Sequence, residues 1–255
     1  RRAFPHAQVV ASDGLPGLSG ARNTGLRRVE ADVVAFLDDD ASADAGWLEA
    51  MARQFADPRV VGVGGWVAPR WESAASGWLA PELYWIVGCS YRGLPDGVAE
   101  IRNPIGANMA FRRAPLLELG GFREGVGRIR DRPLGDEETD LAIRARARWP
   151  QARILHVPQA RVHHAVPAGR TSWRYLVSRS WAEGRSKAQL SQAVGASSAL
   201  ASERTYVTRA LPAGVWSGMR DALRGDPEGI ARAVSIVIAL AVTVAGYAFG
   251  RVRSL

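Results

Sequence analysis

The chain has 255 residues, of which 47% are hydrophobic, and this suffices for one large α/β domain or two small ones and excludes a disordered or fibrous protein. A single cysteine, Cys89, excludes an internal disulfide and a cysteine-based metal cluster, and we interpret it as a small buried hydrophobic residue. The formal net charge of +8 suits an anionic partner. Because the arginines are spread along the chain and no nucleic-acid-binding motif is present, we expect no nucleic-acid partner.

The first part of the chain alternates segments typical of strands and helices. The predicted elements are a strand over 6–12, a glycine-rich loop over 14–20, a helix over 21–30, a strand over 31–40, a helix over 46–56 and a strand over 59–69. The continuous apolar run before three aspartates favours a strand that is buried on both faces, as in a parallel sheet. We expect Ser42 or Asp44 to cap the helix that follows. This order of elements predicts an α/β layer fold.

The second part of the chain begins with residues 71–97, which are rich in tryptophan and tyrosine and lack a clear period. The elements predicted after it are a strand and a helix within 106–122, a helix over 135–150, short extended segments over 152–166 and a helix over 173–190. Serine and alanine are frequent near residues 191–203, which suggests a linker. We therefore divide the chain into a domain over 1–190, a linker and amphipathic region over 191–228, and a hydrophobic helix over 229–250.

The hydrophobic helix contains a charge-free stretch, residues 233–249, with Arg232 before it and Arg251 after it. Extended to 229–250, the segment has about the length that a bilayer requires. Arginine side chains at both ends can extend to the interface, which also suits Tyr247. We expect a helix that spans the membrane or is embedded in it; the alternative is a helix buried in the core.

Three aspartates, Asp38, Asp39 and Asp40, directly follow the strand predicted over 31–40. Ligands of open α/β sheets bind at the carboxyl ends of the strands. Side chains alternate in an extended segment, so Asp38 and Asp40 are predicted to point one way and Asp39 the other. Two converging carboxylates require a cation, and oxygen ligands suit Mg²⁺ or Mn²⁺. The alternative is a set of solvated acids that cap the next helix.

A second group of acids lies at the predicted helix start over residues 136–140, and a histidine pair, His163 and His164, follows an extended segment. Acids at a helix start are stabilised by the helix dipole without any function. Packed together in a cleft, however, one of them would have a raised pKa and could act as a general base. A histidine pair is more often structural, but either member is a reasonable additional ligand for a cation held by carboxylates.

Five patterns follow one another in the chain: "PGLSGARNTGL", "ADVVAFLDDDA", "NPIGANMAFRR", "GDEETDL" and the histidine pair. In this combination they resemble the family 2 glycosyltransferases with the GT-A fold, over about residues 8–190. The resemblance implies a Rossmann-like mixed sheet flanked by helices. It also implies an enzyme that moves a sugar from a nucleotide-diphosphate donor to a hydroxyl acceptor with inversion.

The resemblance assigns roles to individual residues. It implies Mn²⁺ or Mg²⁺ bound by Asp38, Asp40 and His164, with His163 as the alternative to the last. The acidic motif supplies the catalytic base, which maps to Glu138 with Glu137 beside it, and the assignment could slip by one residue. The donor is expected to contact Asp38, Asp39, Arg22, Asn23, Arg179 and Arg185. The substrate is expected to contact Trp85, Asn108, Asp140 and Trp181.

Members of this family normally begin with a strand, a helix and a second strand that form much of the nucleotide pocket. This sequence matches from a point inside that region, so we expect the base-binding strands to be missing from it. With the hydrophobic helix, the resemblance implies a glycan or polyprenyl-linked acceptor in cell-envelope or lipid-linked glycan synthesis. The expected location is the cell membrane, with the catalytic domain facing the cytoplasm.

Two alternatives remain at this stage. A metal-dependent nucleotidyl- or phosphoryl-transferase could use the same acids, but the sequence has no glycine-rich phosphate loop with a lysine. A catalytically inactive, membrane-tethered remnant is favoured by the missing strands and disfavoured by the retained acids and histidines.

Overall fold

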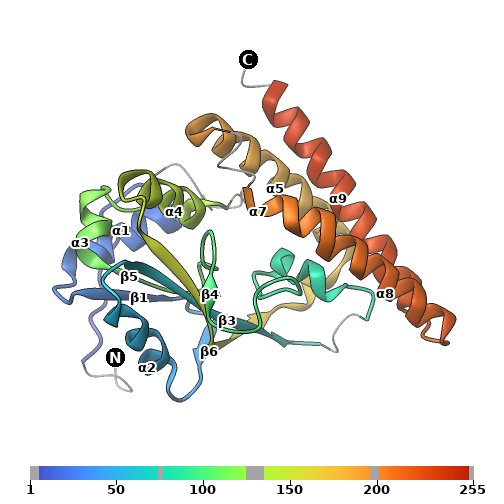
Figure 1. Cartoon of the computed structure of the whole chain (residues 1–255), viewed down its shortest axis with the longest axis horizontal. Coiled ribbons are helices and arrows are strands. Elements are labelled where there is room, and N and C mark those ends of the chain that lie inside the picture. Colours follow the sequence, from blue (N-terminus) through green and yellow to red (C-terminus); the bar gives the residue numbers. More distant parts are fainter. Residues whose placement is uncertain (1–5, 74–76, 125–134, 196–200, 253–255) are drawn as a thin grey trace.

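The computed structural model describes residues 6–73, 77–124, 135–195 and 201–252 (Figure 1). The helices are α1 (Leu18–Arg28), α2 (Trp47–Ala52), α3 (Arg113–Glu118), α4 (Glu137–Arg148), α5 (Trp173–Val194), α7 (Ala201–Thr205), α8 (Leu211–Leu223) and α9 (Gly229–Val252). The strands are β1 (Val33–Leu37), β2 (Ala41–Ala43), β3 (Val60–Trp71), β4 (Ala99–Glu100), β5 (Asn108–Arg112) and β6 (Arg153–Val166). The structure also contains three short 3₁₀ segments and one π-helical turn. They are η1 (Arg53–Ala56), η2 (Pro81–Val87), η3 (Ala168–Thr171) and the π-helical η4 (Tyr206–Ala210).

Within the described residues, six strands form one mixed sheet in the order β1-β5-β3-β6-β2, and β4 pairs with β6. Only β3 and β6 are parallel; the other pairs are antiparallel. The prediction of a mixed sheet flanked by helices is confirmed. The expectation that β1 is buried on both faces of a parallel sheet is wrong, because β1 is an edge strand whose neighbour β5 runs antiparallel, and only Val34 of β1 is buried.

Helices cover the sheet and continue beyond it (Figure 1). On one side α1, α3 and α4 pack through Leu26, Leu116 and Leu141 in a core that includes Phe111 of β5. On the other side Met51 of α2 packs in a second core with residues of β3 and β6. A third core joins η2 to the C-terminal helices, which form a separate layer beside the sheet. These three cores hold the helices named here against apolar parts of the sheet and of η2.

A β-bulge near Gly65 interrupts the pairing of β3 with β6. The side chain of Asn108 lies at this point: its Nδ2 donates to the carbonyl of Trp66 at 3.0 Å and of Ala160 at 2.8 Å, and its Oδ1 accepts from the indole of Trp47 at 2.8 Å. A Cβ at residue 65 would collide with the Ala160 carbonyl. Beyond the bulge β6 continues as one 14-residue strand where the sequence predicts several short segments, and its end carries the histidine pair.

The structure corrects three further expectations. Residues 6–12 form no strand. Neither Ser42 nor Asp44 caps α2, because Ser42 belongs to β2 and the residue before the helix is Gly46, whose φ of 80° suits glycine. The expected linker is partly helical, since α5 extends to Val194 and α7 begins at Ala201. Residues 196–200 of that linker lie outside the described residues.

The long apolar helix expected near residues 229–250 is confirmed as α9, which lies along α5 and α8 (Figure 1). Among the described residues it is the one helix long and apolar enough to cross a membrane. Glycines allow close contact with its neighbour: a Cβ at Gly184 of α5 would collide with the carbonyl of Thr243, and a Cβ at Gly246 of α9 would come 2.5 Å from the carbonyl of Trp181. Backbones therefore pack against each other along the pair of helices.

Candidate metal and acid-base site

A cavity of about 1380 Å³ lies between the C-terminal ends of β1 and β6 and the C-terminal helices. Its polar wall includes Asp38, Glu137, Glu138 and His164, together with basic residues of α1 and α5. Its apolar wall is formed by η4, α8 and α9, including Val207, Leu211, Leu240, Val244 and Tyr247. The cavity is therefore polar beside the sheet and α5 and mainly apolar beside α8 and α9, while η4 also contributes the polar side chains of Thr208 and Arg209.

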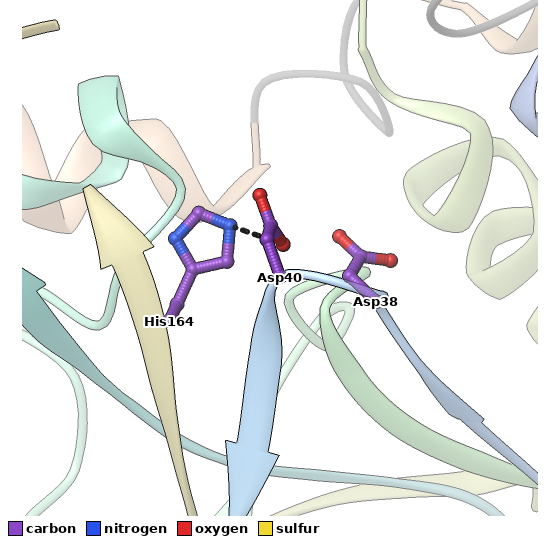
Figure 2. A group of neighbouring side chains, drawn as sticks. All are labelled: Asp38, Asp40 and His164. Atoms are coloured by element: carbon purple, nitrogen blue, oxygen red, sulfur yellow. Dashed lines mark ion pairs between the residues drawn. The ribbon is translucent and has the colours of Figure 1, made fainter. Parts of the chain in front are cut away.

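Three potential metal ligands meet at the end of the sheet, as Figure 2 shows. One ligand atom each from Asp38, Asp40 and His164 lies within 4.8 Å of the others. Asp38 follows β1, Asp40 precedes β2, and His164 is near the end of β6. The pairing of β2 with β6 sets Ala41 opposite His164, and the amide of Ala165 donates to the carbonyl of Asp40 at 2.9 Å. As a result His164 Nε2 lies 3.2 Å from Asp40 Oδ1.

The neighbours of these three residues point elsewhere. Asp39 is exposed and outside the group, which is the alternation that the sequence predicts, and it does not line the cavity, so the structure does not support the donor contact expected of it. His163 Nε2 lies 3.1 Å from Asp44 Oδ1 on the surface, so the structure places His164 in the group and not His163. Two carboxylates and one imidazole are ligands that fit a divalent ion such as Mn²⁺, and the carboxylates also fit Mg²⁺.

Arg22 of α1 connects this group to the second acidic motif. Its side chain is buried; Nη2 lies 3.6 Å from Asp38 Oδ1, and Nη1 donates to Glu137 Oε1 at 2.9 Å. Nη2 also donates to the carbonyl of Gly106 at 3.0 Å. Since both termini of the guanidinium are held, Arg22 fixes the carboxylate of Glu137 and adds positive charge beside Asp38.

Glu138 differs from its neighbours in the second motif. It lines the cavity and makes no ion pair with any residue of the described ranges. Its Oε2 is buried and has no hydrogen-bond partner among those residues. Burial, helped by the negative charge of Glu137, raises the pKa of Glu138 to about 8. A carboxylate that lines a cavity, has a pKa near neutrality and keeps one oxygen without a hydrogen-bond partner can accept a proton from a substrate.

The other acids of this motif are neutralised within the protein. Asp140 is completely buried, and its Oδ2 accepts from Arg144 Nε at 2.8 Å while Arg123 lies 3.3 Å from its Oδ1. It does not line the cavity. Asp136 pairs with Lys187 at 2.6 Å. The predicted substrate contact of Asp140 therefore has a structural explanation, since it anchors α4 to the loop after α3 through Arg144.

The remaining residues singled out in the sequence separate into two groups. Arg179 and Trp85 line the cavity, with the guanidinium 5.7 Å from the centroid of the indole. The residues that do not line it are Asn23, which is hydrogen-bonded to the backbone of Phe122, Asn108, which lies at the β-bulge, Trp181, which packs on Phe249, and Arg185, which is exposed. Their polar or aromatic side chains have structural partners or face away from the cavity.

Sequence reasoning missed several residues of the cavity. Tyr206 of η4 donates to the carbonyl of Glu82 at 2.6 Å and accepts from the indole of Trp85 at 3.0 Å. Arg102 pairs with Glu203 of α7 at 2.7 Å. No local pattern links these positions, because they come from segments about 100 residues apart. Lys187 did carry a signal, since it is the only lysine of the chain.

Comparisons with known proteins indicate the family of the chain. Residues 2–120 match the model of glycosyl transferase family 2. The chain is 37% identical over 172 residues to the glucosyl-dolichyl phosphate glucuronosyltransferase of Haloferax volcanii, which covers 67% of this chain and 55% of that protein. It is 28% identical over 175 residues to the succinoglycan biosynthesis protein ExoM of Rhizobium meliloti, which covers 68% of this chain and 52% of that protein. The chain thus spans about half the length of these two relatives.

A solved structure shares the architecture. The mannosyltransferase PcManGT from Pyrobaculum calidifontis, in complex with GDP-Man and Mn²⁺, superposes with a TM-score of 0.50 at 19% sequence identity, over 90% of this chain and 66% of that chain. This likeness concerns the fold. Residues 2–120 therefore belong to glycosyl transferase family 2, and the chain has the GT-A fold.

Proposed function

We propose that the chain transfers a sugar from a nucleoside-diphosphate donor to a hydroxyl of a lipid-linked acceptor, with inversion at the anomeric carbon. One observation supports this most strongly. A single cavity is lined by Asp38 and His164, which form the candidate metal group with Asp40, and by Glu138, a carboxylate that forms no ion pair among the described residues. The first can hold the leaving group and the second can activate the acceptor.

Asp38, Asp40 and His164 would hold a divalent ion, which when bound supplies positive charge for the diphosphate as it leaves. Arg22 lies beside Asp38 and is kept there by Glu137 and Gly106. Its guanidinium adds a fixed positive charge on the same side of the cavity. Such pre-placed charges stabilise the transition state more than the ground state, because negative charge grows on the leaving diphosphate.

Glu138 would accept the proton of the acceptor hydroxyl as its oxygen attacks the anomeric carbon. The new glycosidic bond forms on the face opposite the bond to the diphosphate, which breaks as the nucleoside diphosphate departs. The acceptor proton remains on the Glu138 carboxylate. A single displacement of this kind inverts the configuration, and no covalent sugar intermediate is required. The raised pKa of Glu138 makes its carboxylate a stronger base than a solvated glutamate.

The apolar wall of the cavity supports a lipid-linked acceptor. Val207, Leu240 and Val244 offer a surface for an isoprenoid chain, and Leu240 and Val244 belong to α9. On the outside, α8 and α9 expose large apolar side chains, among them Trp216 and Val237, which are 67% and 56% exposed. Exposed apolar helices beside such a cavity favour a position at a membrane, where the acceptor is dissolved. The similarity to an enzyme named for dolichyl phosphate points the same way.

Titration calorimetry of the full chain in detergent tests the donor site. UDP, GDP and dTDP are titrated with and without Mn²⁺ into the wild type, Asp40→Ala and Asp39→Ala. The last variant is a matched control, because Asp39 is adjacent, carries the same charge and is exposed. We expect Mn²⁺-dependent binding of one nucleotide that Asp40→Ala abolishes and Asp39→Ala preserves. Equal losses in both variants, or no metal-dependent binding in the wild type, would contradict the proposal.

The reaction itself is tested with the sugar derivatives of the nucleotide that binds. The acceptor is a short polyprenyl phosphate carrying one sugar, and NMR of the product gives the anomeric configuration. We expect an inverted glycosidic bond. Retention of configuration would contradict the single displacement, and transfer of the nucleotidyl group in place of the sugar would support the alternative transferase instead.

A further inference from the structure

Lys187 is the only lysine among the 33 lysine and arginine residues of the chain. It lies on α5, and its side chain is 10% exposed. Its Nζ lies 2.6 Å from Asp136 Oδ1, 3.2 Å from Glu183 Oε1 and 3.3 Å from Glu203 Oε1. The three carboxylates belong to the residue before α4, to α5 and to α7. One ammonium group therefore joins the start of α4 to α5 and to α7.

The geometry explains why this position holds a lysine. Three carboxylate oxygens converge on one nitrogen, which suits an ammonium with three donors, whereas the donors of a guanidinium are spread over a planar fork. Burial lowers the pKa of Lys187, but the carboxylates of Asp136 and Glu183 outweigh burial and raise it, so the group stays charged.

Asp136 depends on Lys187 more than the other two acids do. Arg179 lies 2.9 Å from Glu183 and Arg102 lies 2.7 Å from Glu203, so each of these glutamates has a second cation. Within the part of the chain that the structure describes, Lys187 is the only cation that forms an ion pair with Asp136. Removal of the ammonium would leave Asp136 as the buried acid without a counter-ion.

Asp136 also has an unusual backbone. Its φ of 75° is the only positive value among the described residues other than glycine. Residues other than glycine rarely adopt this backbone conformation, so contacts with the surrounding residues must stabilise it. The carbonyl of Asp136 accepts the amide of Asp140 at 2.8 Å and so starts α4, and Asp136 Oδ1 also accepts from Thr139 Oγ1 at 3.2 Å. Glu138 lies in this first turn, two residues further on.

We propose that Lys187 is a positioning residue that holds Asp136 in its left-handed conformation and thereby fixes the first turn of α4 and the direction of the Glu138 carboxylate. The inference deepens the proposed function and rests on it, because it takes Glu138 as the base. It assigns no contact between Lys187 and the substrate. Its action is indirect, through the backbone at the start of α4.

Hydrogen exchange of the full chain tests the structural step without any sugar transfer. The variants are Lys187→Met and the control Arg174→Met, which removes an exposed basic side chain from the same helix. In Lys187→Met we expect amides of the first turn of α4 to exchange at least about tenfold faster, with the control unchanged. Unchanged exchange in Lys187→Met would overturn the inference, whether or not the chain transfers sugar.

Two substitutions of Asp136 separate backbone conformation from charge. Asp136→Gly and Asp136→Ala both remove the carboxylate, but only glycine adopts a φ of 75° without strain. We expect Asp136→Gly to retain at least about tenfold more kcat than Asp136→Ala. Equal activities would mean that the conformation at residue 136 is not what Lys187 maintains. This pair carries the test even where Lys187→Met fails to fold.

Steady-state kinetics of the Lys187 variants, compared with the wild type, complete the test. We expect Lys187→Met to lower kcat at least about tenfold and to shift its pH dependence, with the donor KM within about twofold. Lys187→Arg keeps the charge but not the convergence on one atom, so we expect it not to restore kcat. Wild-type kcat and pH dependence in Lys187→Met, or full rescue by Lys187→Arg, would overturn the inference. An inactive wild type would instead contradict the proposed function.

Discussion

The two acidic motifs of the chain look alike in sequence but differ in how their carboxylates are neutralised. In residues 38–40 two half-exposed acids gather around the imidazole of His164, while the third faces solvent. In residues 136–140 the acids are buried more deeply, and each has its own environment: a lysine, an arginine, no counter-ion, or two arginines. The comparison shows that the available counter-charge, more than the acid itself, decides whether a carboxylate can serve as ligand, base or anchor.

The largest difference between the motifs concerns Glu138. Replacement by glutamine keeps the shape and removes the proton acceptor, so we expect kcat to fall about 10²–10⁴-fold. Binding of the nucleotide with Mn²⁺ should stay unchanged, because the proposed donor contacts lie in the first motif and at Arg22. Transfer assays measure the loss of kcat, and calorimetry on the same preparation measures nucleotide binding. A Glu138→Gln variant that binds no nucleotide would remove the distinction between the two motifs.

Asp140 should matter for stability and not for chemistry. Its removal in Asp140→Ala leaves the partly exposed guanidinium groups of Arg144 and Arg123 without their buried partner, and we expect a loss of about 1–3 kcal/mol in the free energy of unfolding. Asp39→Ala in the first motif should change it by about 0.5 kcal/mol or less, because Asp39 is exposed. Urea denaturation measures both values. Comparable losses would show that the two motifs do not differ in burial as described.

The pH dependence of Glu138 gives a smaller, graded effect. Its pKa is raised to about 8, so below this pH we expect kcat to rise about tenfold per pH unit, and to level off above it. Because the folded-state pKa lies above the ordinary value of 4.5, the protonated group favours folding at low pH, and this contribution is lost as pH rises from 4.5 through 8.

Thermal unfolding of Glu138→Gln checks the sign of this effect. The variant should gain stability relative to the wild type as pH increases through that range. A constant difference between the two proteins at all pH values would mean that the pKa of Glu138 is not raised.

The link between the two motifs can be weakened at Gly106. A Cβ there would come 2.7 Å from Arg22 Nη2, and Arg22 is held on its other side by Glu137. We expect Gly106→Ala to displace the guanidinium and to weaken nucleotide binding about three- to tenfold. Gly97→Ala is a suitable control, since no atom lies within 4 Å of a Cβ at that position. Calorimetry measures the nucleotide affinity of both variants. Equal affinities of Gly106→Ala and Gly97→Ala would mean that Arg22 does not contribute to the donor site.

The sequence allowed prediction of features that depend on local pattern. The strand before the aspartates, the helix after residue 173 and the apolar helix α9 were predictable from periodicity and composition. Alternation along an extended segment also separates Asp39 from its two neighbours. By contrast, the choice between His163 and His164 depends on the register of β2 against β6, which no local pattern encodes.

Features that depend on distant partners could not be predicted. Asn108 and Asp140 lie in motif-like segments, yet their polar groups are used by the β-bulge and by Arg144. The network around Lys187 draws on residues 136, 183 and 203, so it exists only in the folded chain. A polar residue in a motif is therefore ambiguous from sequence alone, because the same side chain can satisfy a buried backbone or face a substrate.

The glycine contacts between α5 and α9 have a mechanical consequence. At Gly184 and Gly246 the backbones of the two helices are in direct contact, with no side chain between them that could change its rotamer when the helices move. The two helices should therefore move together as a rigid body. Any tilt of α9 would then displace the α5 side chains that border the cavity. A bulky substitution such as Gly184→Leu would separate α5 from α9. The orientation of α9 and the shape of the cavity would then vary independently.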